Sequence, residues 1–476
     1  MSNRPSLRAA SISSASPTNA ELHRRLSLRH ILFIALGSAI GTGLFYGSAG
    51  AISLAGPSVL LAYVIGGAAV FMVMRAMGEM ALAHPVAGAF SEYATRYLGR
   101  WAGFVTGWTY AFEMALVAVA DVTAFAVYMQ FWFPHSPSWV WIAVVLLIIL
   151  SINLVHVKAF GESEFWFTVI KVGAIIAMII GGILLMLFGV TADNGQPATV
   201  ANLWQQGGFF ANGFGGFIAC FTVVMFAFGG IETIGIAAGE AENPKLSIPK
   251  AVNTTPVRIL LFYVLALAVI MSLMPWQTIN GETSPFVQIF NSLGIPAAAH
   301  VLNFVVLTAA ISAINADVYG AGRMLFGLAQ RNMAPRSFAK LDRRGAPYMT
   351  VVSMILVLIV GVLINVFFEN AFLVVASLAT FATVMVWVMI LISHIAFKRQ
   401  LTREGATSEF PTPAWPWASY LALAFMLAIL VQFAFFEDTR LALLVGAIWS
   451  VLLFILYKML PKTQEPSAPI TESTQR

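Results

Sequence analysis

The chain has 476 residues, of which 59% are hydrophobic and only 10% are charged, and its formal net charge is +5. Soluble proteins carry about 25% charged residues, so this composition excludes a soluble protein and indicates an integral membrane protein. Its apolar runs are too long for the strands of a membrane barrel, which favours helices. Cys220 is the only cysteine, so no intrachain disulfide can form.

Polar segments flank the apolar part of the chain. Residues 1–28 are rich in serine and arginine and are expected to form a disordered cytoplasmic tail, and residues 463–476 are expected to do the same. A membrane domain is predicted over residues 29–460. Because about twenty apolar residues cross a bilayer, its apolar runs predict twelve spans: 30–54, 58–83, 101–131, 139–157, 165–189, 211–238, 256–275, 297–319, 350–368, 371–397, 415–436 and 441–458.

The cationic residues predict the orientation of these spans. With twelve spans, 23 of the 26 Lys and Arg residues fall in segments on one side of the membrane. Cytoplasmic segments carry such an excess, so both termini are expected in the cytoplasm. Topology therefore accounts for the positive net charge, and no nucleic-acid partner is expected.

Two spans are interrupted by glycine near mid-membrane depth. The first contains Gly37-Ser38-Ala39-Ile40-Gly41-Thr42-Gly43, and the sixth contains Phe226-Ala227-Phe228-Gly229-Gly230-Ile231-Glu232. Irregular backbone survives at this depth only inside protein or beside a cavity. A pair of such breaks in the two halves of a chain indicates the substrate site of a transporter. Gly37 with Gly41 also matches a helix-packing motif, which is the alternative interpretation.

Several motifs together resemble the amino acid–polyamine–organocation superfamily. They are Ser38-Ala39-Ile40-Gly41-Thr42-Gly43-Leu44-Phe45, Gly78-Glu79-Met80, Glu92-Tyr93-Ala94, Phe228-Gly229-Gly230-Ile231-Glu232 and Arg323-Met324-Leu325-Phe326-Gly327-Leu328-Ala329. Within that superfamily the chain is similar to bacterial amino acid transporters, closest to the proline- and histidine-permease branch. The resemblance implies a LeuT-type fold, with inverted repeats at 29–189 and 211–397, discontinuous helices 1 and 6, and peripheral helices 11 and 12 at 415–458.

The resemblance places the substrate at the two breaks. The half-helix that begins near Thr42 would offer free N–H groups and a positive dipole end to the substrate carboxylate, and glycine there allows close approach. The carboxylate is therefore assigned to Ile40, Gly41, Thr42 and Gly43. The ammonium would meet carbonyls near Ala39, Phe226 and Gly229, with Ala227 and Phe228 in the same segment. Family likeness makes Phe226 a gate, although it could also be a core aromatic.

Charged residues inside spans are costly and are functional candidates by default. Lys171 resembles a lysine that sodium-independent relatives place where sodium-coupled relatives bind sodium, which implies proton coupling. The alternative is a lysine that extends to the cytoplasmic surface. Ser312 and Asn315 are expected near it.

Three acids complete the candidate site. Relatives place an acid at Glu232 in proton coupling, although the helix dipole alone could explain it. Alignment with the family brings Asp317 to the substrate side chain, where a carboxylate could bind an imidazole. The alternative is that Asp317 only satisfies polar groups within the bundle. Glu113 is included as a substrate-binding residue of the same branch.

Other polar residues receive structural interpretations. Arg75 and Glu79 are four residues apart, so they are expected to pair on one helix face. Asp121 is interpreted as structural or as part of a polar network. Histidines near span ends, His394 among them, are interpreted as interfacial. Residues 84–100 predict a short interfacial helix, and residues 320–349 predict a basic amphipathic segment against lipid headgroups.

The sequence therefore predicts a secondary permease of the bacterial inner membrane that imports L-histidine with protons by alternating access. Proline is the main rival substrate, followed by aromatic or cationic amino acids, and exchange remains an alternative to symport. A channel or sensor is a remote alternative, and no enzyme motif is found. No cofactor or metal site is expected. The expected partners are the amino acid, protons and membrane lipids, and the oligomeric state stays open because a monomer can function.

Overall fold

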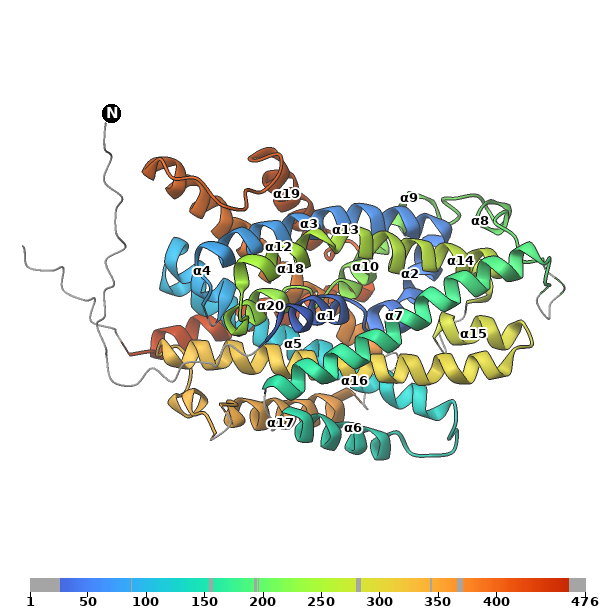
Figure 1. The fold of residues 1–476 in the computed structure, drawn as a ribbon, viewed down its shortest axis with the longest axis horizontal. Coiled ribbons are helices and arrows are strands. Elements are labelled where there is room, and N and C mark those ends of the chain that lie inside the picture. The colour runs from blue at the N-terminus through green and yellow to red at the C-terminus, as the bar shows by residue number, and fades with distance from the viewer. Residues whose placement is uncertain are drawn as a thin grey trace, which may run out of the picture.

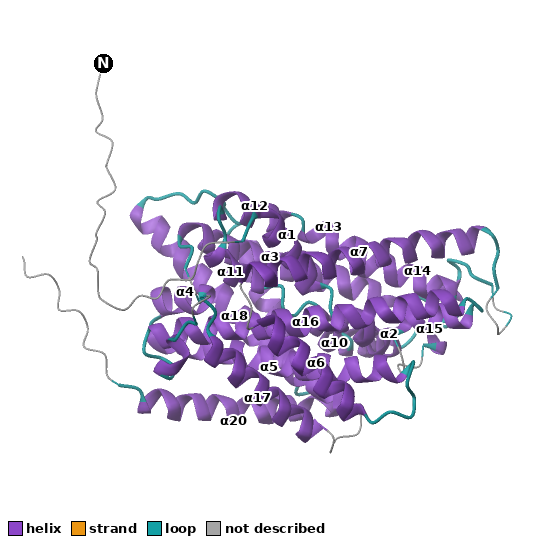
Figure 2. Cartoon of the chain, turned by 60° about the horizontal axis from the view of Figure 1, so that its bottom comes forward, coloured by secondary structure: helices purple, strands orange, loops and turns teal. Residues whose placement is uncertain are grey.

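The computed structural model of the chain describes residues 26–461, except 87, 154–156, 192–194, 196, 280–283, 343–344 and 366–370. Within these residues the backbone forms helices, turns and two isolated β-bridges, with no strand, as Figure 2 shows. The predicted all-helical fold class is confirmed for this part of the chain. The two predicted tails lie outside the described residues, apart from residues 26–28.

The helices follow the predicted spans in order. Those that match spans are α1 (Leu28–Ala39), η1 (Gly43–Gly47), α2 (Ser48–Ala55), α3 (Val59–Ala83), α5 (Arg100–Gln130), α6 (Ser138–Asn153), α7 (Val157–Leu187), α9 (Gly213–Ala219), α10 (Phe221–Ala227), α11 (Thr233–Ala237), α13 (Thr255–Arg258), η4 (Ile259–Leu265), α14 (Ala266–Leu273), α16 (Pro296–Gln330), α17 (Tyr348–Asn365), α18 (Ala371–Glu404), α19 (Trp417–Gln432) and α20 (Glu437–Met459). Shorter elements connect them: η2 (Gly56–Ser58), α4 (Ala89–Leu98), α8 (Asn202–Gln205), η3 (Ala238–Glu240), α12 (Pro244–Asn253), η5 (Trp276–Thr278), α15 (Pro285–Ser292) and η6 (Arg336–Ala339).

Length and hydropathy identify the membrane-crossing segments among the described residues. Seven helical segments are long and apolar enough to cross a bilayer, and four shorter apolar helices accompany them. The first of the seven, Leu28–Ala83, contains two of the predicted spans. The chain is thus a multi-pass membrane protein, while the count of twelve and the inverted repeat stay predictions.

The helices lie along one common direction and their connections gather at two opposite ends. Figure 1 shows α4 and α12 toward one end of the bundle and α8 and α15 toward the other. The long helices α5 and α16 pack side by side through the middle. The predicted short helix within residues 84–100 is present as α4, and Ser91 Oγ on its buried face donates to Gly103 O of α5 at 2.8 Å.

Two helices extend beyond their predicted spans. α7 begins at Val157, not at the predicted residue 165, so Lys171 lies well inside the helix. α16 continues to Gln330, and residues 320–329 are buried, so this part of the predicted surface segment belongs to the bundle interior. Arg323, expected in a cytoplasmic loop, instead pairs with Glu240 at 3.1 Å with its side chain 3% exposed.

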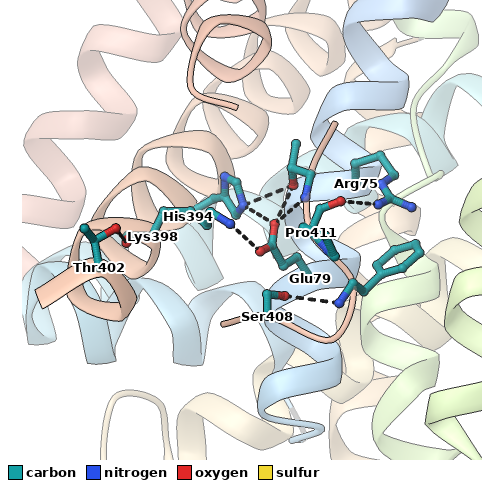
Figure 3. A network of polar contacts seen from close by, with 9 residues as sticks. Arg75, Glu79, His394, Lys398, Thr402, Ser408 and Pro411 are labelled. Carbon is teal, nitrogen blue, oxygen red and sulfur yellow. Dashed lines mark hydrogen bonds and ion pairs between the residues drawn. The ribbon is translucent and has the colours of Figure 1, made fainter. Parts of the chain in front are cut away.

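A buried polar network joins α3 to α18 at the α4 end (Figure 3). Glu79 Oε1 accepts from Lys398 Nζ at 2.9 Å, and its Oε2 contacts His394 Nε2 at 2.9 Å and accepts from the Thr412 hydroxyl at 2.6 Å. Arg75 does not pair with Glu79. It donates to Asn253 Oδ1 at 2.9 Å and to a carbonyl of the 408–412 segment.

The expected Arg75–Glu79 pair and the interfacial placement of His394 are therefore both wrong. The His394 side chain is fully buried, and Thr412 reaches Glu79 from a loop that is distant in sequence. A pair four residues apart on a helix contributes only about 0.2–0.5 kcal/mol. Charge-assisted hydrogen bonds to buried partners on other elements are stronger, so Arg75 and Glu79 each bind such partners and not each other.

Candidate functional site

The first predicted break is present between α1 and η1. Helix α1 ends at Ala39, and Ile40 leaves helical geometry with φ −108° and ψ 82°. Helical hydrogen bonding resumes after the break, where Gly41 O accepts from Leu44 N and Phe45 N, and the first N–H groups of a helix have no acceptor within that helix. Three adjacent donors therefore lie at the start of the resumed helix, which is the positive end of its dipole.

The second predicted break is present between α10 and α11. After Ala227 the chain makes tight turns through residue 232, in which Gly229 N donates to Phe226 O at 2.9 Å. Gly230 has φ +84°, a left-handed conformation that glycine adopts without strain. A Cβ at Gly230 would lie 3.2 Å from Ser38 O, and one at Gly43 would lie 2.6 Å from Ala227 Cα. The two breaks therefore lie against each other.

A small cavity lies where the breaks meet. Its lining comes from both breaks and from α5 and α16: Ser38, Gly41, Thr42, Gly43, Val117, Asp121, Phe226, Ala227, Gly229, Ala313 and Asp317. Its volume is about 20 Å³, which is enough for about one water molecule. An amino acid needs more space, so the cavity must widen to hold one.

Lys171 connects α7 to the first break. Its Nζ donates to Gly37 O at 2.6 Å, Ile40 O at 2.9 Å and Ser312 Oγ at 3.0 Å, and its side chain is fully buried. All three ammonium donors are used, so the alternative of a lysine that reaches the surface is wrong. The expected proximity of Ser312 is confirmed. The ammonium also lies at the negative end of the α1 dipole, where a cation is stabilised.

Glu164 is a buried acid that sequence reasoning missed. Its Oε2 accepts from Ser312 Oγ at 2.6 Å and its Oε1 accepts from Asn315 Nδ2 at 2.8 Å. Asn315 Oδ1 in turn accepts from Asn153 Nδ2 at 2.7 Å. Glu164 is therefore the negative partner that Lys171 reaches through Ser312. Its position seven residues before Lys171 on one helix was the available signal.

Glu232 and Glu113 form a second buried acidic group. Glu232 Oε1 accepts from Gly230 N at 3.3 Å and its Oε2 accepts from Trp387 Nε1 at 3.0 Å. Glu113 of α5 lies beside Glu232 and the Thr383 hydroxyl, and it does not line the cavity. Two adjoining buried carboxyl groups are most stable when they share a proton.

Asp121 and Asp317 both reach the cavity. Asp317 is 4% exposed, and its Oδ2 has no hydrogen-bond partner among the described residues. Asp121 Oδ1 accepts from the Thr42 hydroxyl, and its Oδ2 is also without a partner there. Asp121 was interpreted as structural or as part of a polar network; the structure gives it one hydrogen bond, from Thr42, and a position at the cavity that was not predicted from the sequence.

Aromatic rings cover one side of the cavity. Phe226 lines it and packs edge-on against Phe372, with 5.7 Å between ring centroids, and Tyr46 packs on Phe372 at 4.7 Å. Phe228 turns away from the cavity and packs with Tyr63 and Tyr263. Of the predicted residues, Gly41, Thr42, Gly43, Phe226, Ala227, Gly229 and Asp317 line the cavity, whereas Ile40, Phe228 and Glu113 do not. The side chain of Ala39 lies outside the described part of the structure.

A cavity between two interrupted membrane helices, with buried charges on either side, is typical of secondary transporters. Comparison with known proteins specifies the class. A family model described as amino acid permease matches residues 30–468. The chain belongs to the amino acid permease family. Its function is amino acid transport, not enzymatic catalysis.

Curated relatives agree over nearly the whole chain. An uncharacterized amino acid permease of Bacillus subtilis, YtnA, is 47% identical and covers 92% of this chain and 95% of its own length. The aromatic amino acid transport protein AroP of Escherichia coli is 47% identical, and the match covers 93% of this chain and 96% of AroP. The amino-acid permease AapA of Bacillus subtilis is 46% identical, and the match covers 92% of this chain and 95% of AapA.

Proposed function

We propose that the chain imports an amino acid with a ring side chain by proton-coupled alternating access, and that histidine is its preferred substrate. Asp317 is the observation that carries this choice. Its carboxylate is buried at the cavity, and one oxygen has no partner among the described residues. An imidazole N–H can donate to that oxygen, and an imidazolium can pair with it.

The breaks would hold the amino acid backbone. The N–H groups of Gly41, Thr42 and Gly43 would bind the substrate carboxylate, because they lie where the helix resumes, at the positive end of its dipole. Phe226 would close over the ring as a gate. Ile40 belongs to the same carboxylate segment, and Ala227 and Phe228 belong to the second break. Carbonyls near Ala39, Phe226 and Gly229 are the acceptors considered for the ammonium group.

Proton coupling is assigned to Lys171 and to Glu232 with its neighbour Glu113. Lys171 Nζ occupies the place of a cation between the carbonyls of the first break and Ser312. Loss of a proton would weaken its hold on α1. The Glu232–Glu113 pair can accept or release a shared proton beside the second break. Both groups link protonation to the helices that must move.

Aromatic amino acids are the second candidate substrates, because AroP of Escherichia coli is an aromatic amino acid transport protein at 47% identity. Phe226, Phe372 and Tyr46 could pack against any aromatic ring. Proline, the other rival, would leave Asp317 without a side-chain donor. Exchange instead of symport is the mechanistic alternative, and counterflow in proteoliposomes separates a carrier from a channel or a sensor.

The arrangement in the membrane is part of the same proposal. A LeuT-type inverted repeat would let α1, α3, α10 and the α13–α14 span swing against α5, α7, α16 and α18. The excess of cationic residues in segments on one side supports cytoplasmic termini, and the bacterial relatives support a location in the inner membrane. A monomer holds every residue of the site.

The test is a competition panel of twenty amino acids against labelled histidine in proteoliposomes, with and without an imposed pH gradient. We expect histidine to compete best and the gradient to increase uptake. Asp317→Asn should weaken histidine about tenfold to a hundredfold and leave phenylalanine nearly unchanged. Equal losses for both substrates would contradict the role of Asp317, and a panel led by phenylalanine would favour the aromatic alternative.

A further inference from the structure

We propose that Asp121 binds the α-ammonium group of the substrate through its Oδ2 atom. The proposal rests on the proposed function only in that the substrate is an α-amino acid, whatever its side chain. Asp121 lies on α5, is 2% exposed and lines the cavity between the two breaks. Nothing in its own helix requires a carboxylate at this depth, where an ionisable group is costly.

One carboxylate oxygen of Asp121 is occupied and the other is free. Oδ1 accepts from the Thr42 hydroxyl, whereas Oδ2 is buried without a hydrogen-bond partner among the described residues. A buried oxygen without a donor carries a desolvation penalty. A ligand that supplies a donor at this point would remove that penalty.

The position beside Thr42 selects the ammonium group over the side chain. In an α-amino acid the carboxylate and the ammonium are attached to the same carbon, so their ligands must be neighbours. The N–H groups that suit the carboxylate belong to Gly41, Thr42 and Gly43, and Asp121 is bonded to Thr42 itself. Asp317 approaches from α16 and remains available to the side chain.

Several backbone carbonyls at the breaks are already engaged. Gly37 O and Ile40 O accept from Lys171, Phe226 O accepts from Gly229 N, and Ala227 O accepts from the Tyr263 hydroxyl at 2.9 Å. An ammonium has three donors and forms its stronger bonds with an ionised acceptor. The free Asp121 oxygen is therefore a better ligand than a carbonyl that is already shared.

The proposal predicts a loss that depends on the ammonium group of the ligand. Asp121→Asn keeps the side-chain volume and an oxygen for Thr42 but removes the charge. We expect it to weaken an amino acid about tenfold to a hundredfold. The desamino analogue, which has the same ring and carboxylate but no ammonium, should bind wild type and Asp121→Asn about equally.

The experiment measures binding by the purified full-length protein in detergent. The probes are histidine with imidazolepropionate and phenylalanine with phenylpropionate, and the result is the affinity ratio of amino acid to desamino analogue. We expect Asp121→Asn to lower this ratio at least tenfold. The control Asp317→Asn should change the preference between the two rings while the ratio is kept.

An unchanged ratio in folded Asp121→Asn would overturn the proposal. If Asp121→Asn does not fold, Asp121→Ser, which keeps a hydroxyl for Thr42, is measured in its place. We expect the same fall in the affinity ratio, and an unchanged ratio would again overturn the proposal. If histidine fails to bind but another amino acid does, the proposed substrate is wrong. The Asp121 ratio is then measured with that amino acid and its desamino analogue, so the two failures are distinguishable.

Discussion

The two helix breaks differ in where their compensating charge comes from. At the first break, the carbonyls of Gly37 and Ile40 accept from Lys171, which belongs to a different helix, α7. At the second break, the charge is part of the break itself, because Glu232 immediately precedes α11 and accepts from Gly230 N. A cation thus faces a helix C-terminus at one break, and an acid faces a helix N-terminus at the other, as the dipoles require.

Lys171 acts as an anchor, because it holds the first break to a different helix, whereas Glu232 is a local cap within the second break. Any motion of α1 relative to α7 must break the bonds of Lys171, and α1 is further joined to α7 by Arg29–Glu162 and by Thr168 Oγ1 donating to Phe33 O at 3.2 Å. Glu232 moves together with the second break, and the Trp387 indole of α18 and its neighbour Glu113 of α5 link it to the rest of the bundle. The first break is therefore expected to be the more sensitive of the two.

The largest expected effect is at the anchor. Lys171→Met removes the donor of two carbonyls and leaves Glu164 as a buried acid without its cation. Removal of one partner of a buried pair costs about 3–5 kcal/mol, so uptake should fall about 100-fold or more. Uptake into proteoliposomes with and without a pH gradient measures this, with the exposed Lys458→Met as the matched control.

Two further variants decide what Lys171 does. Lys171→Arg keeps the charge but cannot release its proton, so residual uptake should no longer respond to the gradient. Lys171→Met combined with Glu164→Gln should recover protein yield, because no unpaired charge remains, without recovering proton dependence. Unchanged proton dependence in both Lys171→Met and Lys171→Arg would remove Lys171 from the coupling mechanism.

The contact between the breaks gives the next largest effect. In Gly43→Ala the new Cβ would lie 2.6 Å from Ala227 Cα and 3.2 Å from Ala227 N. Backbone atoms cannot move to another rotamer as a side chain can, so the two breaks must separate. This costs about 1–3 kcal/mol or more of stability. Uptake should fall about tenfold to a hundredfold. Gly173→Ala in α7, which meets no atom within 4 Å, should retain transport. Equal activity of the two variants would show that the breaks do not need this contact.

The sequence was sufficient to predict the breaks because their cause is local. Glycine in a helix interior costs about 1 kcal/mol relative to alanine, so glycines clustered at mid-depth weaken an apolar span at that point. Gly41 and Gly230 lie at the two interruptions. The order of the helices also follows from apolar length alone. Helix ends were less certain, because α16 continues past Asp317 through buried Arg323, whose charge is balanced by Glu240 of a different element.

The partners of the buried charges could not be predicted in the same way. Family likeness indicated that Lys171 lies at a functional site with Ser312 nearby. The role of Glu164 depends on the packing of α7 against α16, which brings it to Ser312. Glu79 was assigned to its neighbour on the same helix, whereas it binds His394 and Lys398 of α18. Such pairs depend on tertiary packing, and a local rule that contributes a few tenths of a kcal/mol does not decide them.

The local cap at the second break gives a moderate effect. Trp387→Phe removes the indole donor to Glu232 Oε2 and keeps an aromatic ring in place. A hydrogen bond to a charged group contributes about 1.5–3 kcal/mol, so the uptake rate should fall by about tenfold while substrate affinity changes little. Trp417→Phe, at a tryptophan that is 80% exposed, is the control. A larger loss than that of Lys171→Met would reverse the proposed ranking of the two breaks.

The smallest expected effect tests whether charge, not hydrogen bonding as such, distinguishes the breaks. At the second break Ala227 O accepts from the neutral Tyr263 hydroxyl at 2.9 Å, whereas the carbonyls of the first break accept from an ammonium. Tyr263→Phe removes a neutral bond, which contributes about 0.5–1.5 kcal/mol. The apparent melting temperature in detergent should therefore fall by only about 2–4 °C, with Tyr420→Phe at the exposed Tyr420 as control. If Tyr263→Phe abolished uptake as Lys171→Met should, pairing of the carbonyl would be the requirement and the sign of the charge would not matter.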